Sequence, residues 1–145
     1  MLACGLPVVY DCDKELPNKK VIIVSVPGAF TPACTANHIP PYIEKINQLK
    51  SKGVDEIIVV SANDPFVQSA WGKALDARNK MIFASDGNSE FSESIGFSQD
   101  LSAKGLGRRN NRYALVVDHG IVTYAEKETG MDIGVSGVDA VLAKL

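Results

Sequence analysis

The fold is decided by the run Lys20-Val-Ile-Ile-Val-Ser-Val26, which leads directly into Pro27-Gly-Ala-Phe-Thr-Pro-Ala-Cys34. The first run is β-branched and apolar on both faces, which is typical of a strand buried inside a parallel or mixed sheet. In α/β sheets, ligands collect beyond the carboxyl ends of the strands. The second run therefore begins where a functional site is expected.

A second buried strand follows after one helix. Segment 42–52 has apolar residues at helical spacing and ends before Gly53, and Glu56-Ile-Ile-Val-Val-Ser-Ala62 repeats the pattern of the first strand. Strand, helix and strand form a βαβ unit, whose crossover is expected to be right-handed.

Shorter elements are predicted in the middle of the chain. Asp64 is a plausible N-cap for a helix over 65–75, a third strand is expected over 81–85, and a short helix over 89–95. Segment 99–111 is rich in Gly, Ser, Asn and Arg, and we predict that it is a loop.

The C-terminal part contains a hairpin signal and a final helix. Runs 112–118 and 121–125 are rich in β-forming residues and are joined by His119-Gly120, which predicts an antiparallel pair. Segment 136–145 places apolar residues on one helical face. The order of elements predicts an α/β protein with a thioredoxin-like fold, a central mixed β-sheet flanked by helices, in one domain over 1–145.

Composition limits the possible partners. The 145 residues are 46% hydrophobic and 22% charged with a net charge of -2, so no basic excess favours nucleic acid. The longest apolar stretch is far shorter than the roughly 20 residues that span a bilayer. Three cysteines (Cys4, Cys12 and Cys34) are too few for a disulfide framework, which favours a reducing compartment with at least one free thiol.

Cys34 is the candidate nucleophile. Thr31 is a good N-cap and Pro32 suits the first helical position, which puts Cys34 in the first turn of a helix. Unsatisfied N–H groups and the helix dipole there favour an anion, here a thiolate. The alternative is a buried cysteine that acts as a small hydrophobic residue. The flanking Gly, Thr, Pro and His argue against that alternative.

These residues resemble a known family. Pro27, Thr31 and Cys34 reproduce the Pro-x-x-x-Thr/Ser-x-x-Cys motif of the peroxiredoxins, and the run 26–38 resembles their type-five branch. The resemblance covers nearly all of the chain, and the fungal peroxisomal members are the most similar. It continues through three later segments, 54–71, 94–97 and 112–118.

The resemblance implies a thiol-dependent peroxidase that reduces hydrogen peroxide and alkyl hydroperoxides through a cysteine sulfenic acid, in antioxidant defence. Cys34 would be the peroxidatic residue, and Arg112 would stabilise both the thiolate and the peroxide. Thr31 would hydrogen-bond the thiolate or the peroxide, and Pro27 would shield the sulfur from water. The family needs no cofactor beyond reducing equivalents from thioredoxin or glutathione.

The route that reduces the sulfenic acid is left open. No cysteine follows Cys34, so the resemblance points instead to Cys4, whose Cys-x-x-Pro context looks like that of fungal relatives that form a disulfide with the partner subunit. Cys12 is a weaker candidate. Glutathione or another external thiol could also reduce Cys34 directly. His38, four residues after Cys34, is expected either to contact substrate or partner or to be structural.

Further expectations concern location and assembly. The C-terminal Ala143-Lys144-Leu145 resembles a Ser-Lys-Leu peroxisomal address read by an import receptor, with cytoplasm and mitochondrion as alternatives. The resemblance also implies a homodimer. Family members usually begin with additional N-terminal strands, and we expect this chain to lack them.

The sequence allows three rival interpretations. A metal site formed by Cys4, Cys12, Cys34 and His38 is disfavoured because no Cys-x-x-Cys pair is present, and a thioredoxin-like reductase is disfavoured for the same reason. A non-catalytic redox sensor or binding module on the same fold is the alternative function. Turnover distinguishes a peroxidase from a sensor, because a sensor needs only stoichiometric oxidation of Cys34.

Overall fold

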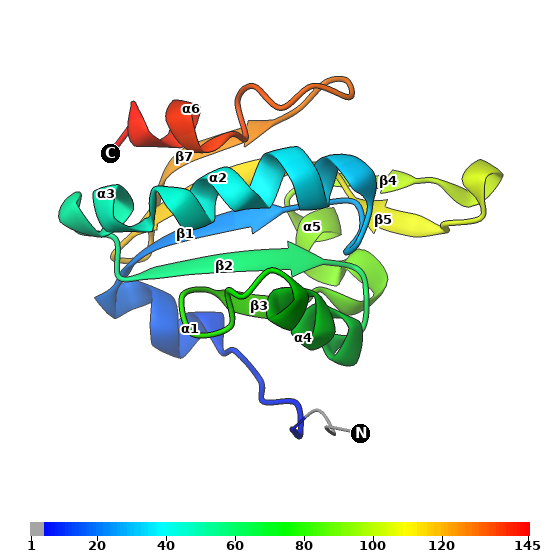
Figure 1. The fold of residues 1–145 in the computed structure, drawn as a ribbon, viewed down its shortest axis with the longest axis horizontal. Helices are drawn as coiled ribbons and strands as arrows, with labels where there is room; N and C mark the ends of the chain where they lie inside the picture. The colour runs from blue at the N-terminus through cyan, green and yellow to red at the C-terminus, as the bar shows by residue number, and fades with distance from the viewer. Residues whose placement is uncertain (1–4) are drawn as a thin grey trace.

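A mixed five-stranded sheet in the order β3-β2-β1-β6-β7 forms the centre of the computed structural model, which describes residues 5–145 (Figure 1). β1, β2 and β3 are parallel, β6 pairs antiparallel with β1, and β7 pairs antiparallel with β6. The predicted mixed sheet and hairpin are confirmed. The strands are β1 (Lys20–Ser25), β2 (Glu56–Ser61), β3 (Ile82–Ser85), β6 (Tyr113–Asp118) and β7 (Ile121–Lys127).

β1 is central because its side chains are buried on both faces. Ile22 and Val24 join one apolar core, and Val21 and Ile23 join the other. The first core packs against α2 (Ile39–Glu44), α3 (Ile46–Ser51), α4 (Pro65–Ala74) and α6 (Val138–Leu142). The second packs against α5 (Glu90–Ser94) and against residues flanking the short α1 (Cys12–Glu15). Helices therefore cover both faces of the sheet, as the strand pattern predicted.

The expectation of a loop over 99–111 is wrong in part. A separate two-stranded sheet, formed by β4 (Ser98–Asp100) and β5 (Arg108–Asn110), occupies this region, and Ser98 pairs with Asn110. A 3-10 turn over Ser102–Lys104 lies between the strands. The strands are short and carry polar side chains, so they lack the apolar alternation from which a strand is predicted.

The helix predicted over 42–52 begins earlier and is divided in two, α2 and α3. Helical backbone already begins at Pro32, and Cys34–His38 form a π-helical segment in which the Ile39 N–H donates to the Cys34 carbonyl, five residues back. Pro40 and Pro41 follow immediately and have no N–H to donate. The two prolines thus interrupt the regular hydrogen bonding, and the helix accommodates the break as a π segment.

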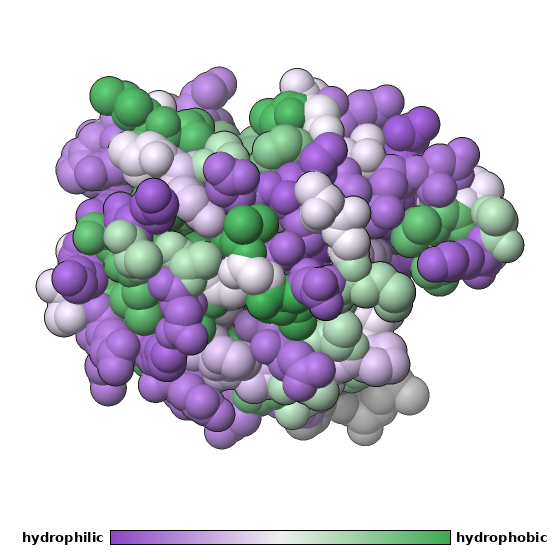
Figure 2. Space-filling model, turned by 90° about the horizontal axis from the view of Figure 1, so that it is seen from above, coloured by the Kyte–Doolittle hydropathy of each residue, from purple (hydrophilic) through white to green (hydrophobic). Residues whose placement is uncertain are grey.

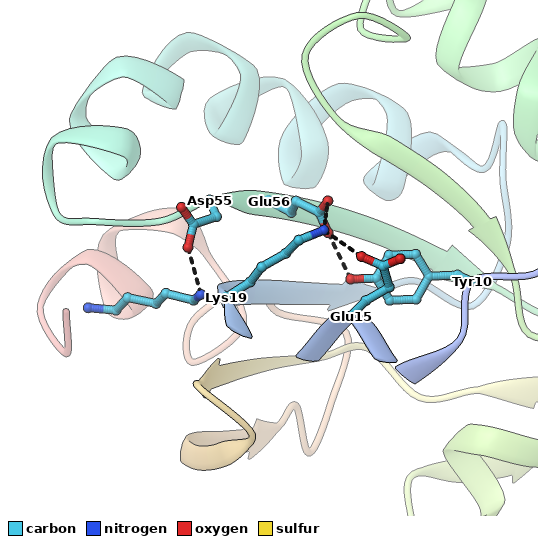
Figure 3. A network of polar contacts seen from close by, with 6 residues as sticks. Tyr10, Glu15, Lys19, Asp55 and Glu56 are labelled. Carbon is cyan, nitrogen blue, oxygen red and sulfur yellow. Dashed lines mark hydrogen bonds and ion pairs between the residues drawn. The ribbon is translucent and has the colours of Figure 1, made fainter. Parts of the chain in front are cut away.

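A polar network fastens the N-terminal segment to the end of the sheet at which β1 and β2 begin (Figure 3). The Tyr10 hydroxyl donates to Glu56 Oε2 at 2.7 Å. Lys19 Nζ contacts Glu15 at 2.6 Å and Glu56 at 2.8 Å. Burial, followed by the Glu56 hydrogen bond, raises the pKa of Tyr10, so the phenol remains the donor. Residues around α1 are thereby held at this end of the sheet.

Figure 2, the molecule seen from above the view of Figure 1, shows hydrophobic residues in separate patches among hydrophilic ones. Among residues 5–145, no helix is both long and apolar enough to cross a membrane.

Candidate active site

Cys34 follows the carboxyl end of β1 in the chain, whereas the residues around α1 are tied to the end of the sheet at which β1 and β2 begin. A short loop leaves the strand and leads to the helical turn that begins at Pro32. The Cys34 side chain belongs to the apolar core on this face and is 1% exposed. The position agrees with the first turn predicted from Thr31 and Pro32, and the π segment starts at the cysteine itself.

Arg112 reaches the sulfur from the neighbouring strand. Because β6 runs antiparallel to β1 and Tyr113 pairs with Ser25, Arg112 stands beside the end of β1 from which the Cys34 loop departs. Its Nη2 donates to Cys34 Sγ at 3.2 Å, and its Nη1 lies 2.8 Å from His38 Nδ1. The guanidinium cannot lose its proton, so the sulfur always faces a cation.

The hydrogen bonds of His38 define its protonation. Nε2 lies 2.9 Å from the Ser136 carbonyl oxygen, which can only accept, so Nε2 carries the proton and Nδ1 accepts from Arg112. The pKa of His38 is lowered to about 4, chiefly by burial and also by the nearby Arg112 charge, against the opposing effects of Ser136 and Glu128. The imidazole is therefore neutral at neutral pH.

Thr31 occupies the start of the helix but does not use its side chain as a cap. Its carbonyl accepts from the Thr35 N–H at 3.0 Å, whereas its hydroxyl donates to the Gly28 carbonyl at 2.7 Å. The one hydroxyl proton is thus directed into the loop and not towards Cys34. The expected hydrogen bond to a thiolate or peroxide requires that hydroxyl to rotate.

The loop beside Cys34 is held from two sides. Asn63, which follows β2, accepts the Ala29 N–H on its Oδ1 at 2.8 Å. Arg109 of β5 places Nη1 3.4 Å from the Pro27 carbonyl. A Cβ at Gly28 would lie 3.0 Å from Thr31 Cγ2 and 3.5 Å from Arg109 Nη1, so the glycine permits this close approach. Pro27 itself is half-buried at the end of the strand.

The sequence did not predict four of these contributors, namely Asn63, Arg109, Glu128 and Ser136. Asn63 and Arg109 hold the loop, whereas Glu128 and Ser136 lie behind His38. No motif marks Arg109, Glu128 or Ser136, because their contacts join segments that are far apart in the chain. Asn63 falls in the family-like segment 54–71, and the predicted βαβ unit places it near the end of β1, whereas Arg109 lies in a segment expected to be a loop.

Of the other two cysteines, the structure describes only Cys12. Cys4 lies outside the described residues. Cys12 is a free, half-buried thiol in α1, and burial, followed by the Asp13 and Asp11 charges, raises its pKa. α1 is held at the opposite end of the sheet, and the six residues of β1 alone span about 20 Å. Cys12 is therefore badly placed to react with Cys34 of the same chain.

Within residues 5–145, no group of three or more His, Cys, Asp or Glu side chains could hold a metal ion. Both nitrogens of His38 are already engaged by Arg112 and Ser136. The arrangement instead joins a buried sulfur to a fixed cation, which suits an attacking thiolate and the charge that develops on oxygen.

Comparisons with known proteins agree with this chemistry. The family model described as Redoxin matches residues 1–142, and the chain belongs to that family of thiol-dependent oxidoreductases. More particularly, it is a peroxiredoxin of the type-five branch, a thiol-dependent peroxidase with a peroxide as its substrate. The redox-sensor alternative is not favoured.

Relatives from several organisms support the assignment. A Lipomyces kononenkoae protein named a peroxisomal peroxiredoxin is 58% identical over 144 residues, which cover 99% of this chain and 86% of the relative. Peroxiredoxin-2B of Arabidopsis thaliana is 50% identical over 127 residues, covering 88% of this chain and 78% of the relative. The crystal structure of reduced Prx3 from Vibrio vulnificus in complex with hydrogen peroxide is 42% identical with a TM-score of 0.82, covering 86% and 79% of the two chains.

Proposed function

We propose that Cys34 is the residue that reduces the peroxide and that Arg112 is its principal electrostatic partner. The observation that carries the proposal is the 3.2 Å contact from Arg112 Nη2 to the buried Cys34 Sγ, beyond the end of β1. A charge-assisted hydrogen bond of this kind strengthens when water is excluded. Within residues 5–145, Cys34 is the cysteine whose sulfur accepts a hydrogen bond from a cationic side chain.

The chemistry follows from this geometry. The Cys34 thiolate attacks one peroxide oxygen, an S–O bond forms, and the O–O bond breaks. The departing oxygen leaves with the bonding electron pair, takes up a proton and becomes water or an alcohol, while the sulfur is oxidised to the sulfenic acid. The Arg112 guanidinium supplies fixed donors to the oxygens on which negative charge develops. Rotation of the Thr31 hydroxyl would add a further donor.

His38 supports this reaction from behind Arg112. It is fully buried, and both ring nitrogens are engaged, so its contacts favour a role in orienting the guanidinium over the expected contact with substrate. Pro27, near the start of the loop that follows β1, remains the residue proposed to shield the sulfur from water.

The sulfenic acid is reduced either by Cys4 or by an external thiol. The remote position of Cys12 supports its exclusion as the intramolecular resolving residue. In either route a thiolate attacks the sulfenic sulfur, water leaves and a disulfide forms, and a further thiol then restores Cys34. Thioredoxin would supply electrons to a Cys34–Cys4 disulfide, whereas glutathione could serve a one-cysteine cycle.

A peroxisomal location is proposed from the C-terminal tripeptide and from the Lipomyces relative that is named peroxisomal. Ala143 and Lys144 are exposed, but Leu145 packs partly against the core. An import receptor would therefore have to draw the last residue away from α6. A homodimer is likewise proposed from family resemblance.

The test is peroxide consumption by the wild type, Cys34→Ser, Cys4→Ser and Cys12→Ser, with thioredoxin or glutathione supplied separately. We expect Cys34→Ser to be inactive with both reductants and Cys12→Ser to resemble the wild type. Loss of thioredoxin-driven turnover in Cys4→Ser would identify Cys4 as the resolving residue, and full activity with glutathione would support the one-cysteine cycle. Retained turnover in Cys34→Ser would overturn the proposal.

A further inference from the structure

Behind the Cys34–Arg112 pair, hydrogen bonds continue to the far edge of the sheet. Arg112 Nη1 donates to His38 Nδ1 at 2.8 Å, and His38 Nε2 donates to the Ser136 carbonyl at 2.9 Å. The same carbonyl accepts the Tyr42 hydroxyl at 2.7 Å. The orientation of the guanidinium therefore depends on where Ser136 lies.

Ser136 belongs to an irregular connection between β7 and α6, and its position is fixed by Glu128. Glu128 Oε1 accepts the Ser136 N–H at 2.8 Å, the Ser136 hydroxyl at 2.9 Å and the Gly134 N–H at 2.7 Å. Ser136 is fully buried, whereas neighbouring Met131 is 90% exposed. Glu128 Oε1 thus holds the otherwise exposed connection in place at Ser136, the residue that His38 contacts.

Glu128 is also tied to Arg112 through the backbone. Its N–H donates to the Arg112 carbonyl at 2.9 Å, where β7 continues beside the start of β6. Glu128 consequently contacts both ends of the hydrogen-bonded series that joins Arg112, His38 and Ser136. Its N–H binds the Arg112 main chain, and its carboxylate binds Ser136. A displacement of its side chain would move the acceptor of His38 while leaving the Arg112 backbone in the sheet.

We propose that Glu128 is a positioning residue for the peroxidase reaction, which acts through Ser136 and His38 on the guanidinium of Arg112. The carboxylate holds the Ser136 carbonyl in place, the carbonyl keeps the proton of His38 on Nε2, and the free Nδ1 directs Arg112 towards Cys34. The inference rests on the proposed function of Cys34 and Arg112.

A double-mutant cycle tests whether Glu128 acts on the reaction through His38. The rate constant for hydrogen peroxide is measured in Glu128→Ala, His38→Ala and the double variant, with Glu126→Ala as the matched control. Glu126 lies in β7, two residues before Glu128, and is exposed, and its side chain forms no hydrogen bond within the described part of the chain. We expect Glu128→Ala to lower the rate constant about ten- to a hundredfold and Glu126→Ala to leave it within about twofold.

Non-additivity distinguishes positioning from a general loss of structure. If Glu128 acts through His38, the double variant is no slower than His38→Ala alone. Glu128→Gln, which keeps an acceptor oxygen, should recover most of the rate. Multiplied losses in the double variant, or a wild-type rate in Glu128→Ala, would overturn the proposal.

One further measurement separates this proposal from the proposed function. The Nε2–H proton of His38, followed by NMR without peroxide, should be protected from exchange in the wild type and in Glu126→Ala and lose that protection in Glu128→Ala. Unchanged protection would overturn the role of Glu128 even if Cys34 is confirmed as the peroxidatic residue. If Glu128→Ala does not fold, Ser136→Ala, which keeps both backbone donors to Glu128, takes its place in the cycle, with a smaller loss expected.

Discussion

Arg112 and Cys34 are separated by 78 positions in the chain, yet Arg112 Nη2 lies 3.2 Å from Cys34 Sγ. The antiparallel register of β1 and β6 produces this contact, since Tyr113 pairs with Ser25 at the end of β1 that leads into the cysteine loop. The second guanidinium nitrogen, Nη1, is occupied by His38. Both contacts depend on the planar fork of arginine, which lysine does not possess.

Arg112→Lys should therefore lower kcat/KM for hydrogen peroxide about a hundred- to a thousandfold, because an ammonium lacks the fixed planar fork that points one nitrogen at His38 and another at Cys34. Arg108→Lys is the control, since Arg108 is exposed and contacts Ser98 and Glu93. Stopped-flow kinetics at saturating reductant would measure both variants. An unchanged kcat/KM in Arg112→Lys would show that the fork is not needed.

The buried neutral state of His38 predicts a pH dependence of stability. Its pKa is lowered from 6.5 to about 4 in the folded protein, so the unfolded state binds the proton first as the pH falls. The stabilisation is complete above about pH 6.5 and is lost as the pH falls through about 4. It corresponds to about 3 kcal/mol of unfolding free energy.

His38→Asn should remove this part of the pH dependence. Denaturant unfolding at pH 7 and at pH 5 would compare the wild type with His38→Asn and with His119→Asn, whose histidine is exposed. The loss of stability between the two pH values should be smaller in His38→Asn than in the other two proteins. Equal losses in all three would mean that His38 is accessible to protons in the folded state.

Asn63→Ala should loosen the loop beside Cys34. The substitution leaves the nearly buried Ala29 N–H without its acceptor, at a cost of about 1–3 kcal/mol in stability. Because Ala29 lies between Pro27 and Thr31, the rate of reaction with peroxide should fall as well. Asn79→Ala, at an exposed position, should change neither quantity. Thermal unfolding and peroxide kinetics would measure both variants, and equal effects of Asn63→Ala and Asn79→Ala would contradict the role of Asn63 in holding the loop.

Gly72→Ala should destabilise the protein although alanine favours helices. Gly72 lies in α4, and a Cβ there would come within 2.6 Å of the Phe83 ring on β3. The overpacking should cost about 1–3 kcal/mol, more than the gain in helix propensity. At Gly130 no atom lies within 4 Å of the added Cβ, so Gly130→Ala should be nearly neutral. A stabilised Gly72→Ala would mean that Phe83 moves aside freely.

Periodicity predicted the elements that are long or strongly apolar, including β1, β2, α4 with its Asp64 cap, and the β6–β7 hairpin. It could not predict β4 and β5, whose pairing is short and polar. The expected positions of Thr31 directly before the helix and of Cys34 in its first turn agree with the structure, but the Thr31 side chain does not cap the helix, and its partner depends on a loop conformation that no propensity specifies. The roles of Glu128 and Ser136 could not be predicted from the sequence, because their contacts form only when the connection between β7 and α6 packs against His38.

The most direct test of the central claim is the fate of one equivalent of hydrogen peroxide added to the fully reduced protein. A sulfenic-acid-specific reagent would trap the product, and peptide mass spectrometry would identify the modified cysteine. We predict rapid trapping at Cys34, none at Cys12, and no rapid peroxide consumption by Cys34→Ser. Trapping at Cys12 or Cys4 in the wild type, with Cys34 left reduced, would contradict the assignment of Cys34 as the peroxidatic residue.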